Sequence, residues 1–164
     1  MGYSLTFYTD KNGSGILTLS ITQRIITILC FLAVGSAFVF NAINHYSLWL
    51  NGFFLVLTFL GCFYRESWYF STKDQSITFS FGIAFWVKKN IIPIENVNGI
   101  KLVKILQKTG KGKEEKVVTT QLILTAAEKD AVIDSVKGKN TKKVETAAKE
   151  IAQILGLELE YITI

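Results

Sequence analysis

Two long apolar runs dominate the first 64 residues of the chain. Residues 25–43 and 48–64 contain no charged side chain, and only four residues separate the two runs. At a rise of about 1.5 Å per residue, the first run is long enough to cross a hydrocarbon core of about 30 Å, and the second is at the short end of the spanning range. A connection this short joins antiparallel helices. The pattern therefore predicts a transmembrane helical hairpin over residues 25–64.

After residue 65 the apolar residues recur at every second position, which is the period of β-strands. Three polar stretches predict turns, at residues 73–76, 95–99 and 108–116, and the last is a lysine-rich loop that we expect to be mobile. Pro93, the only proline of the chain, lacks an N–H and so marks a strand edge or a corner. The predicted strands cover residues 68–72, 77–87, 100–106, 117–125, 131–136 and 157–164.

One amphipathic helix is predicted near the end of the chain. Asn140 or Thr141 can cap its first turn, and Gly156 can end it. Its apolar residues recur at helical spacing, so we expect them to pack as a stripe on the sheet. These residues are Val144, Ala147, Ala148, Ile151, Ala152 and Leu155.

Residues 1–24 form a separate segment before the membrane. Residues 3–9 and 16–21 are strand-like and flank the turn-forming run 10–15, so a β-hairpin that can join the later sheet is predicted. The run also resembles the opening of a calcium-binding loop, but Ile21 stands where that loop needs a bidentate glutamate. A plain turn is therefore the better interpretation, and no metal site is predicted.

The distribution of charge predicts the orientation in the membrane. Of the 31 charged residues, only Asp10, Lys11 and Arg24 lie in residues 1–64, and the turn between the two apolar runs contains no lysine or arginine. Because positive residues favour the cytoplasmic side, we expect an inner (cytoplasmic) membrane protein with both termini in the cytoplasm. Aromatic residues at helix ends commonly anchor them in the interface. The candidate anchors are Tyr46 and Trp49 at the far interface, and Tyr64 and Trp68 at the near one.

Residues 65–164 carry 16 basic and 12 acidic residues, a net charge of +4. Such a mixed surface is usually just solvated, and the small excess argues against binding of nucleic acid. Some lysines remain candidates for contact with anionic lipid headgroups or with a partner. They are Lys88, Lys89, Lys101, Lys104, Lys111 and Lys113.

The usual catalytic and cofactor-binding motifs are missing from the sequence. The single histidine, His45, lies in the predicted far-side turn, remote from any cytoplasmic serine or aspartate. Neither a C-x-x-C nor an H-E-x-x-H motif is present, and the glycine-lysine pairs lack the rest of a phosphate-binding loop. Asp130 and Asp134 could take part in acid–base chemistry, but no spacing brings two acids together. We therefore expect no enzyme activity, no cofactor and no metal.

Several short motifs carry a resemblance to a known family. They are the helical hairpin, the W-x-F strand at Trp68, the segment Ile92–Val97, Leu122 and Leu124, and the helix Ala147–Leu157. In this combination the chain resembles the bacterial membrane-anchored PH-like proteins, and it is loosely similar to the two-span photosystem I assembly factor family. The resemblance implies a membrane α-helical hairpin followed by an α+β domain over residues 65–164, in which a PH-like antiparallel β-barrel or sheet carries a C-terminal helix. Neither family supplies catalytic residues.

The expected function follows from these features together. We expect a non-catalytic inner-membrane protein that presents a PH-like domain at the cytoplasmic face, as an assembly factor or accessory subunit of a membrane protein complex. Membrane lipids and a protein partner or a second copy of the chain are the expected contacts, because exposed strand edges suit partner pairing. The alternative is a module that senses anionic lipids through the lysines named above.

Overall fold

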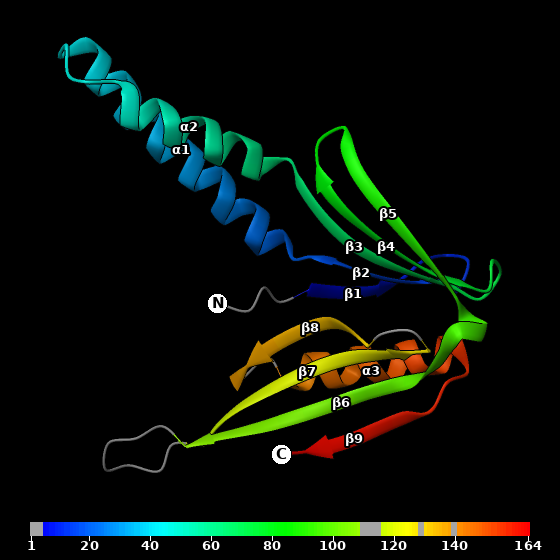
Figure 1. The fold of residues 1–164 in the computed structure, drawn as a ribbon. Coiled ribbons are helices and arrows are strands. Elements are labelled where there is room, and N and C mark those ends of the chain that lie inside the picture. The colour runs from blue at the N-terminus through cyan, green and yellow to red at the C-terminus, as the bar shows by residue number, and fades with distance from the viewer. Residues whose placement is uncertain (1–4, 109–115, 128–129, 139–140) are drawn as a thin grey trace.

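The computed structural model describes residues 5–108, 116–127, 130–138 and 141–164. A pair of antiparallel helices projects from a body that contains two β-sheets and a third helix (Figure 1). The one long apolar helix, the shorter apolar helix and the antiparallel sheets with a C-terminal helix all agree with the fold expected from the sequence.

The first sheet contains five antiparallel strands in chain order. The predicted N-terminal hairpin is confirmed, since Leu5 pairs with Leu19 and Thr9 with Gly15. This hairpin also joins the later sheet, because β2 pairs with β3 from Gly15↔Phe70 to Thr18↔Ser67. The strands are β1 (Leu5–Thr9), β2 (Gly15–Leu19), β3 (Tyr64–Ser71), β4 (Ser76–Ile83) and β5 (Trp86–Pro93).

The two apolar helices are inserted between adjacent strands of this sheet. Helix α1 (Ile21–Ile43) follows β2 after one residue, Ser20, whose hydroxyl caps the helix by accepting a hydrogen bond from the Gln23 N–H at 3.2 Å. Helix α2 (Trp49–Cys62) precedes β3, again with one residue between them. The helical hairpin is therefore inserted in the connection between the paired strands β2 and β3.

The second apolar helix is shorter than predicted. Residues 48–64 were expected to be helical, but α2 has 14 residues and Tyr64 already belongs to β3. The ladder of the sheet explains the early end: Tyr64 pairs with Ile83, and the Ala84 N–H donates a hydrogen bond to the Phe63 carbonyl at 3.1 Å. Backbone groups that a seventeen-residue helix would use are thus bonded within the sheet.

The second sheet has the strand order β8-β7-β6-β9. The short helix η1 (Ile94–Asn96) leads into it from Pro93, and β6 begins at Val97 inside the predicted turn, with an irregular register between Val97 and Gly99. The predicted C-terminal edge strand is present and runs parallel to β6. Most of the predicted lysine-rich loop lies outside the described residues. The strands are β6 (Val97–Lys108), β7 (Lys116–Ala126), β8 (Ala131–Lys137) and β9 (Leu159–Thr163).

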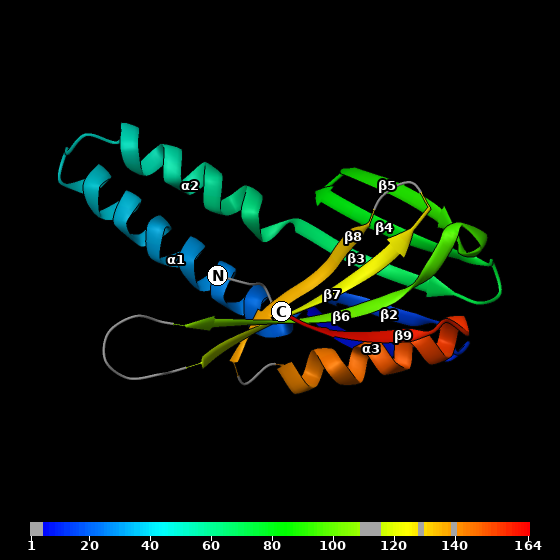
Figure 2. The ribbon, with the colours of Figure 1, turned by 60° about the horizontal axis from the view of Figure 1, so that its bottom comes forward.

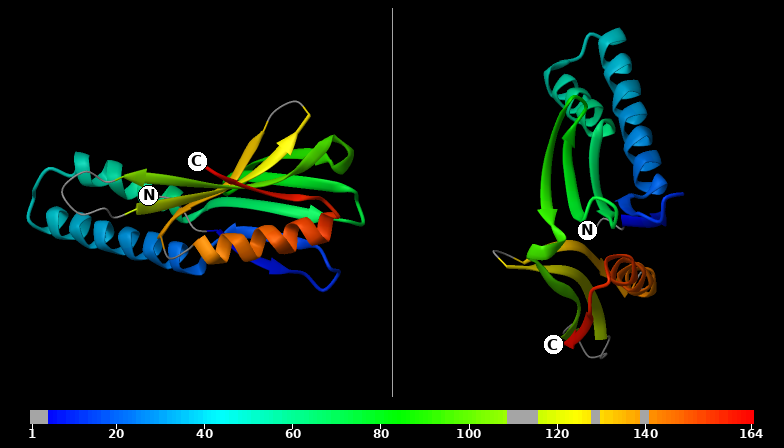
Figure 3. Two further views of the ribbon diagram at one scale, coloured as in Figure 1. Left: turned by 90° about the horizontal axis from the view of Figure 1, so that it is seen from below. Right: turned by 90° about the vertical axis from the view of Figure 1, so that its right-hand side faces the viewer.

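Helix α3 (Thr141–Leu155) completes the core between the two sheets. All six residues of its predicted apolar stripe are buried, and Figures 2 and 3 show it running along one side of the strands. Gly156 has φ +66° and ends the helix, after which the Leu157 N–H bonds to the Ala152 carbonyl at 3.0 Å. The apolar strand residues buried most completely are Leu17, Phe70, Ile77, Ile100, Leu102, Leu122 and Leu124.

Candidate functional site

Helices α1 and α2 present their apolar residues outward. Neither helix has a buried residue, and α1 is long and apolar enough to cross a membrane, whereas α2 is a shorter apolar helix. At about 1.5 Å per residue they extend about 34 Å and about 21 Å. An exposed apolar surface of this extent marks a site of contact with a membrane or with another protein.

Three hydroxyl groups within the two helices are hydrogen-bonded inside the helices. The hydroxyls of Thr27, Ser36 and Thr58 donate to carbonyl oxygens one turn earlier, at 2.8–3.0 Å. The helices contact each other through Phe31 and Phe59, whose ring centroids lie 5.7 Å apart. A helix in an apolar solvent needs such hydrogen bonds, because the solvent offers its polar groups no partners.

The predicted interface anchors fall into two groups. Tyr46 and Trp49 are exposed at the far end of the hairpin, and Tyr64 lies at the near end, where its hydroxyl donates to Glu66. Trp68, in contrast, is only 4% exposed and stacks on Phe79 at a centroid distance of 4.3 Å. It lies on the inner face of its strand, so we correct its assignment from membrane anchor to core residue.

The predicted lysines do not form one patch. Lys88 and Lys89 are exposed on β5, while Lys101 and Lys104 lie on β6 in the other sheet. Lys104 forms an ion pair with Glu145 at 2.6 Å, and Lys101 lies 4.0 Å from Glu160. Lys101 and Lys104 thus each have an acidic neighbour. Lys111 and Lys113 lie outside the described residues.

A further exposed feature was not singled out from the sequence. Phe85 and Trp86 form the tip of the β4–β5 hairpin and are 100% and 88% exposed. The alternation of apolar residues continues through Phe85 in the sequence, which favours an uninterrupted strand there. In the structure Ala84, with φ +51°, turns the chain instead. The one sequence signal for this turn is a break in the alternation, because two aromatic residues, Phe85 and Trp86, follow each other directly.

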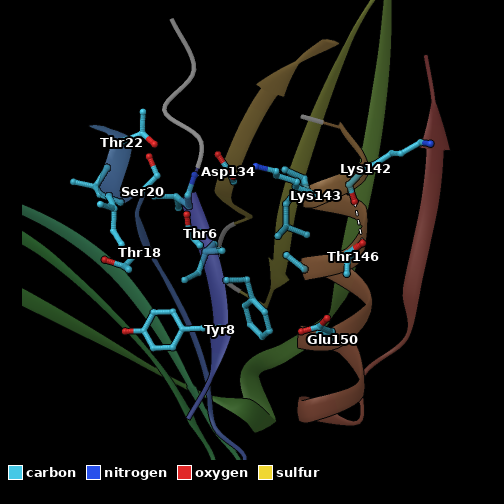
Figure 4. Close-up of a pocket in the computed structure, with 18 residues that line it drawn as sticks. Thr6, Tyr8, Thr18, Ser20, Thr22, Asp134, Lys142, Lys143, Thr146 and Glu150 are labelled. Atoms are coloured by element: carbon cyan, nitrogen blue, oxygen red, sulfur yellow. Dashed lines mark hydrogen bonds between the residues drawn. The ribbon is translucent and has the colours of Figure 1, made fainter. Parts of the chain in front are cut away.

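A groove of about 820 Å³ opens between β1, β2, β8 and α3 (Figure 4). Strand β1 is the outer strand of its sheet, so one of its edges faces this groove without a neighbouring strand in the described part of the chain. In Figure 4, Lys143 points across the groove and Lys142 points away from it. The apolar lining includes Leu5, Leu17, Leu19, Leu122, Val144 and Ala147.

Asp134 links the two sheets at the end of this groove. Its carboxylate accepts hydrogen bonds from the backbone N–H groups of Leu5, at 3.4 Å, and of Ser135, at 2.8 Å. Burial is the main cause that raises the pKa of Asp134 from 3.8 to about 6, and the charge of Glu66 adds to it, while the two hydrogen bonds act in the opposite direction. The carboxyl group of Asp134 therefore binds a proton more readily in the folded chain than in the unfolded chain.

Asp134→Asn is expected to stabilise the protein at pH 8. Because the raised pKa means that folding binds a proton, wild-type stability falls as the pH rises from about 4 through 6, and the asparagine removes this loss. After allowance for solvent screening, we expect a gain of about 1–2 kcal/mol at pH 8 and little difference at pH 4. Thermal unfolding at both pH values measures it, with exposed Asp130→Asn as the control. Equal melting shifts for both variants would contradict the assignment.

Two carboxyl groups, those of Asp134 and Glu150, line the groove. In the described residues the Asp134 carboxylate has hydrogen bonds only to backbone N–H groups, and no hydrogen bond joins it to a nucleophile or to a second acid. Across the same residues, no three histidine, cysteine, aspartate or glutamate side chains come close enough to hold a metal ion. Comparison of the chain with protein-family models, with curated proteins and with solved structures gave no match.

Proposed function

We propose that the chain is a non-catalytic inner-membrane protein whose helical hairpin holds a PH-like domain at the cytoplasmic face, where it acts as an assembly factor or accessory subunit of a membrane protein complex. The observation that carries this proposal is the apolar hairpin α1–α2, none of whose residues is buried within the chain. Soluble proteins cover such surfaces, and a bilayer would cover this one on all sides.

Both helices would span the membrane, with the two chain termini in the cytoplasm. Helix α1 matches the hydrocarbon thickness, and α2 would cross with Leu48 and Phe63 extending it and with local thinning of the bilayer. Ser20 and Tyr64 then lie at the same surface, because β2 and β3 are paired. Positive residues Arg24 and Arg65 stand at this end of the hairpin, as the positive-inside rule requires.

The domain offers partner-binding features rather than a reaction centre. The outer edge of β1 and the apolar groove beside α3 could receive an extended segment of a partner, by addition of a strand to the sheet. Lipid sensing through six lysines is less well supported, because Lys101 and Lys104 already have acidic neighbours. We therefore favour a protein partner or a second copy of the chain.

Membrane extraction and purification in mild detergent test the proposal. We expect the chain to resist extraction with alkaline carbonate, to dissolve in detergent and to co-purify with a stoichiometric membrane protein or with itself. A cysteine introduced at His45 should react with an impermeant maleimide from the periplasmic side only. Release by carbonate would contradict the membrane assignment, whereas a lone monomer in detergent would contradict the role in assembly.

A further inference from the structure

The β4–β5 turn lies against the end of the helical hairpin. Ile83 pairs with Trp86, so Ala84 and Phe85 form a two-residue turn, and the Ala84 N–H donates to the carbonyl of Phe63, the residue that follows α2. Figures 1 and 3 show this turn at the same end of the sheet as the helix ends. This hydrogen bond fixes the position of the β4–β5 turn relative to the end of α2.

The turn exposes two aromatic side chains that the sheet cannot cover. Phe85 is the second residue of the turn and is fully exposed, and Trp86, the first residue of β5, is 88% exposed. Behind them the rings of Trp68, Phe79 and Phe81 are stacked in sequence, at centroid distances of 4.3 and 5.2 Å, which supports the hairpin from the core. A supported turn that ends in two exposed aromatic residues is a surface built for contact.

Basic residues follow the aromatic pair, two and three positions after Trp86. Lys88 and Lys89 are exposed on β5, and Arg65 on β3 is opposite Gly82. Aromatic rings at the level of lipid headgroups, with lysine or arginine directly behind them, are typical of proteins that contact an anionic cytoplasmic leaflet. The charge behind the tip therefore favours a lipid surface over an apolar protein groove.

We infer that the β4–β5 turn is a third membrane contact, in which Phe85 and Trp86 enter the lipid interface beside the end of α2 and Lys88 and Lys89 lie over anionic headgroups. This inference rests on the proposed function, because it requires α1 and α2 to lie in the bilayer. Because β2, β3, β4 and β5 are neighbours in the sheet, the two helix ends and the β4–β5 turn lie in a row along one end of the sheet, and the turn extends the membrane contact along this row.

A fluorescent probe at the turn tests the inference. The full chain, with Cys30 and Cys62 replaced by alanine, carries a single NBD-labelled cysteine at Phe85 in vesicles of phosphatidylethanolamine and phosphatidylglycerol. We expect a blue-shifted emission, protection from iodide and quenching by lipids with a spin label near the headgroup. The matched control is Lys73→Cys, at the opposite end of the same sheet, which should emit as in water.

A third labelled site separates this inference from the proposed function. Phe54→Cys lies within α2 and should be quenched by lipids with a spin label deep in the acyl chain. If Phe54→Cys is quenched but Phe85→Cys behaves like Lys73→Cys, the hairpin is in the bilayer and the third contact is refuted. If neither is quenched, the proposed function fails first. Protection of Phe85→Cys from iodide without quenching by lipid would identify a protein partner and also refute the inference.

Native tryptophan fluorescence gives a second measurement without a label at the tip. In Trp49→Phe, the remaining tryptophans are buried Trp68 and exposed Trp86. We expect brominated lipids to quench part of the emission, and the further change Trp86→Phe to remove the quenched part. Lys88→Glu with Lys89→Glu should reduce the quenching severalfold in anionic vesicles. Equal quenching with and without Trp86 would overturn the inference.

Discussion

Replacement of residues 21–64 by Asn-Gly is expected to yield a water-soluble, folded protein. Continuation of the β2–β3 register beyond Thr18↔Ser67 places Ser20 opposite Arg65, so a two-residue turn closes the pair that the helical hairpin now joins. The core contains no residue from α1 or α2. The chain should therefore move from the membrane fraction to the soluble fraction while it keeps the circular dichroism of strands and of α3.

The matched control replaces only residues 44–47 with the same Asn-Gly turn. This variant keeps both apolar helices and is expected to remain in the membrane fraction. A shortened chain that stays with the membrane, or that is soluble but shows no cooperative thermal transition, would contradict the view that the hairpin is an insertion into a sheet that is stable without it.

Phe70→Ala is expected to cause the largest loss of stability among single substitutions in the sheet. Phe70 has no exposed surface and lies in the core between the two sheets and α3, so its truncation leaves a cavity. Such changes cost about 3–5 kcal/mol in the free energy of unfolding. Phe85→Ala removes the same atoms from a fully exposed position and should cost less than about 0.5 kcal/mol.

Urea unfolding of the detergent-solubilised protein, followed by the fluorescence of buried Trp68, measures both variants. The difference between them matters more than either value, because the detergent and the hairpin are the same in each. Equal losses for Phe70→Ala and Phe85→Ala would show that the tip is packed against protein in solution, and this would weigh against a free aromatic turn.

Local patterns in the sequence predicted most of the individual elements. The helical spacing from Val144 to Leu155 predicted α3, with Asn140 or Thr141 as its first cap and Gly156 at its end, because a single face of that helix meets the core. The N-terminal hairpin and the strand predicted over residues 131–136 were likewise visible as apolar runs bounded by turn residues. Each of these elements is determined by residues that are close together in the sequence.

Long-range pairings could not be read from those patterns. Trp68 was assigned to the membrane surface because it follows an apolar run, yet its strand places it on the same inner face as Phe70. The groove brings Leu5 to Asp134, 129 residues later, and no local signal marks such a contact. Similarly, the backbone bond from Ala84 to Phe63, and with it the place of the aromatic turn, depends on the register of β3 and β4.

The insertion of the hairpin between β2 and β3 has a consequence for the order of folding during synthesis. Strand β2 leaves the ribosome before α1, but its partner β3 follows only after α2. Until β3 is made, β1 and β2 form an isolated two-stranded hairpin, which is only marginally stable. Association of α1 with α2 brings Ser20 and Phe63 side by side, and the entropy of closing the intervening loop is then already lost. Under the proposed function, insertion of the helices into the bilayer therefore comes first, and the inserted pair is the template on which the five-stranded sheet is completed.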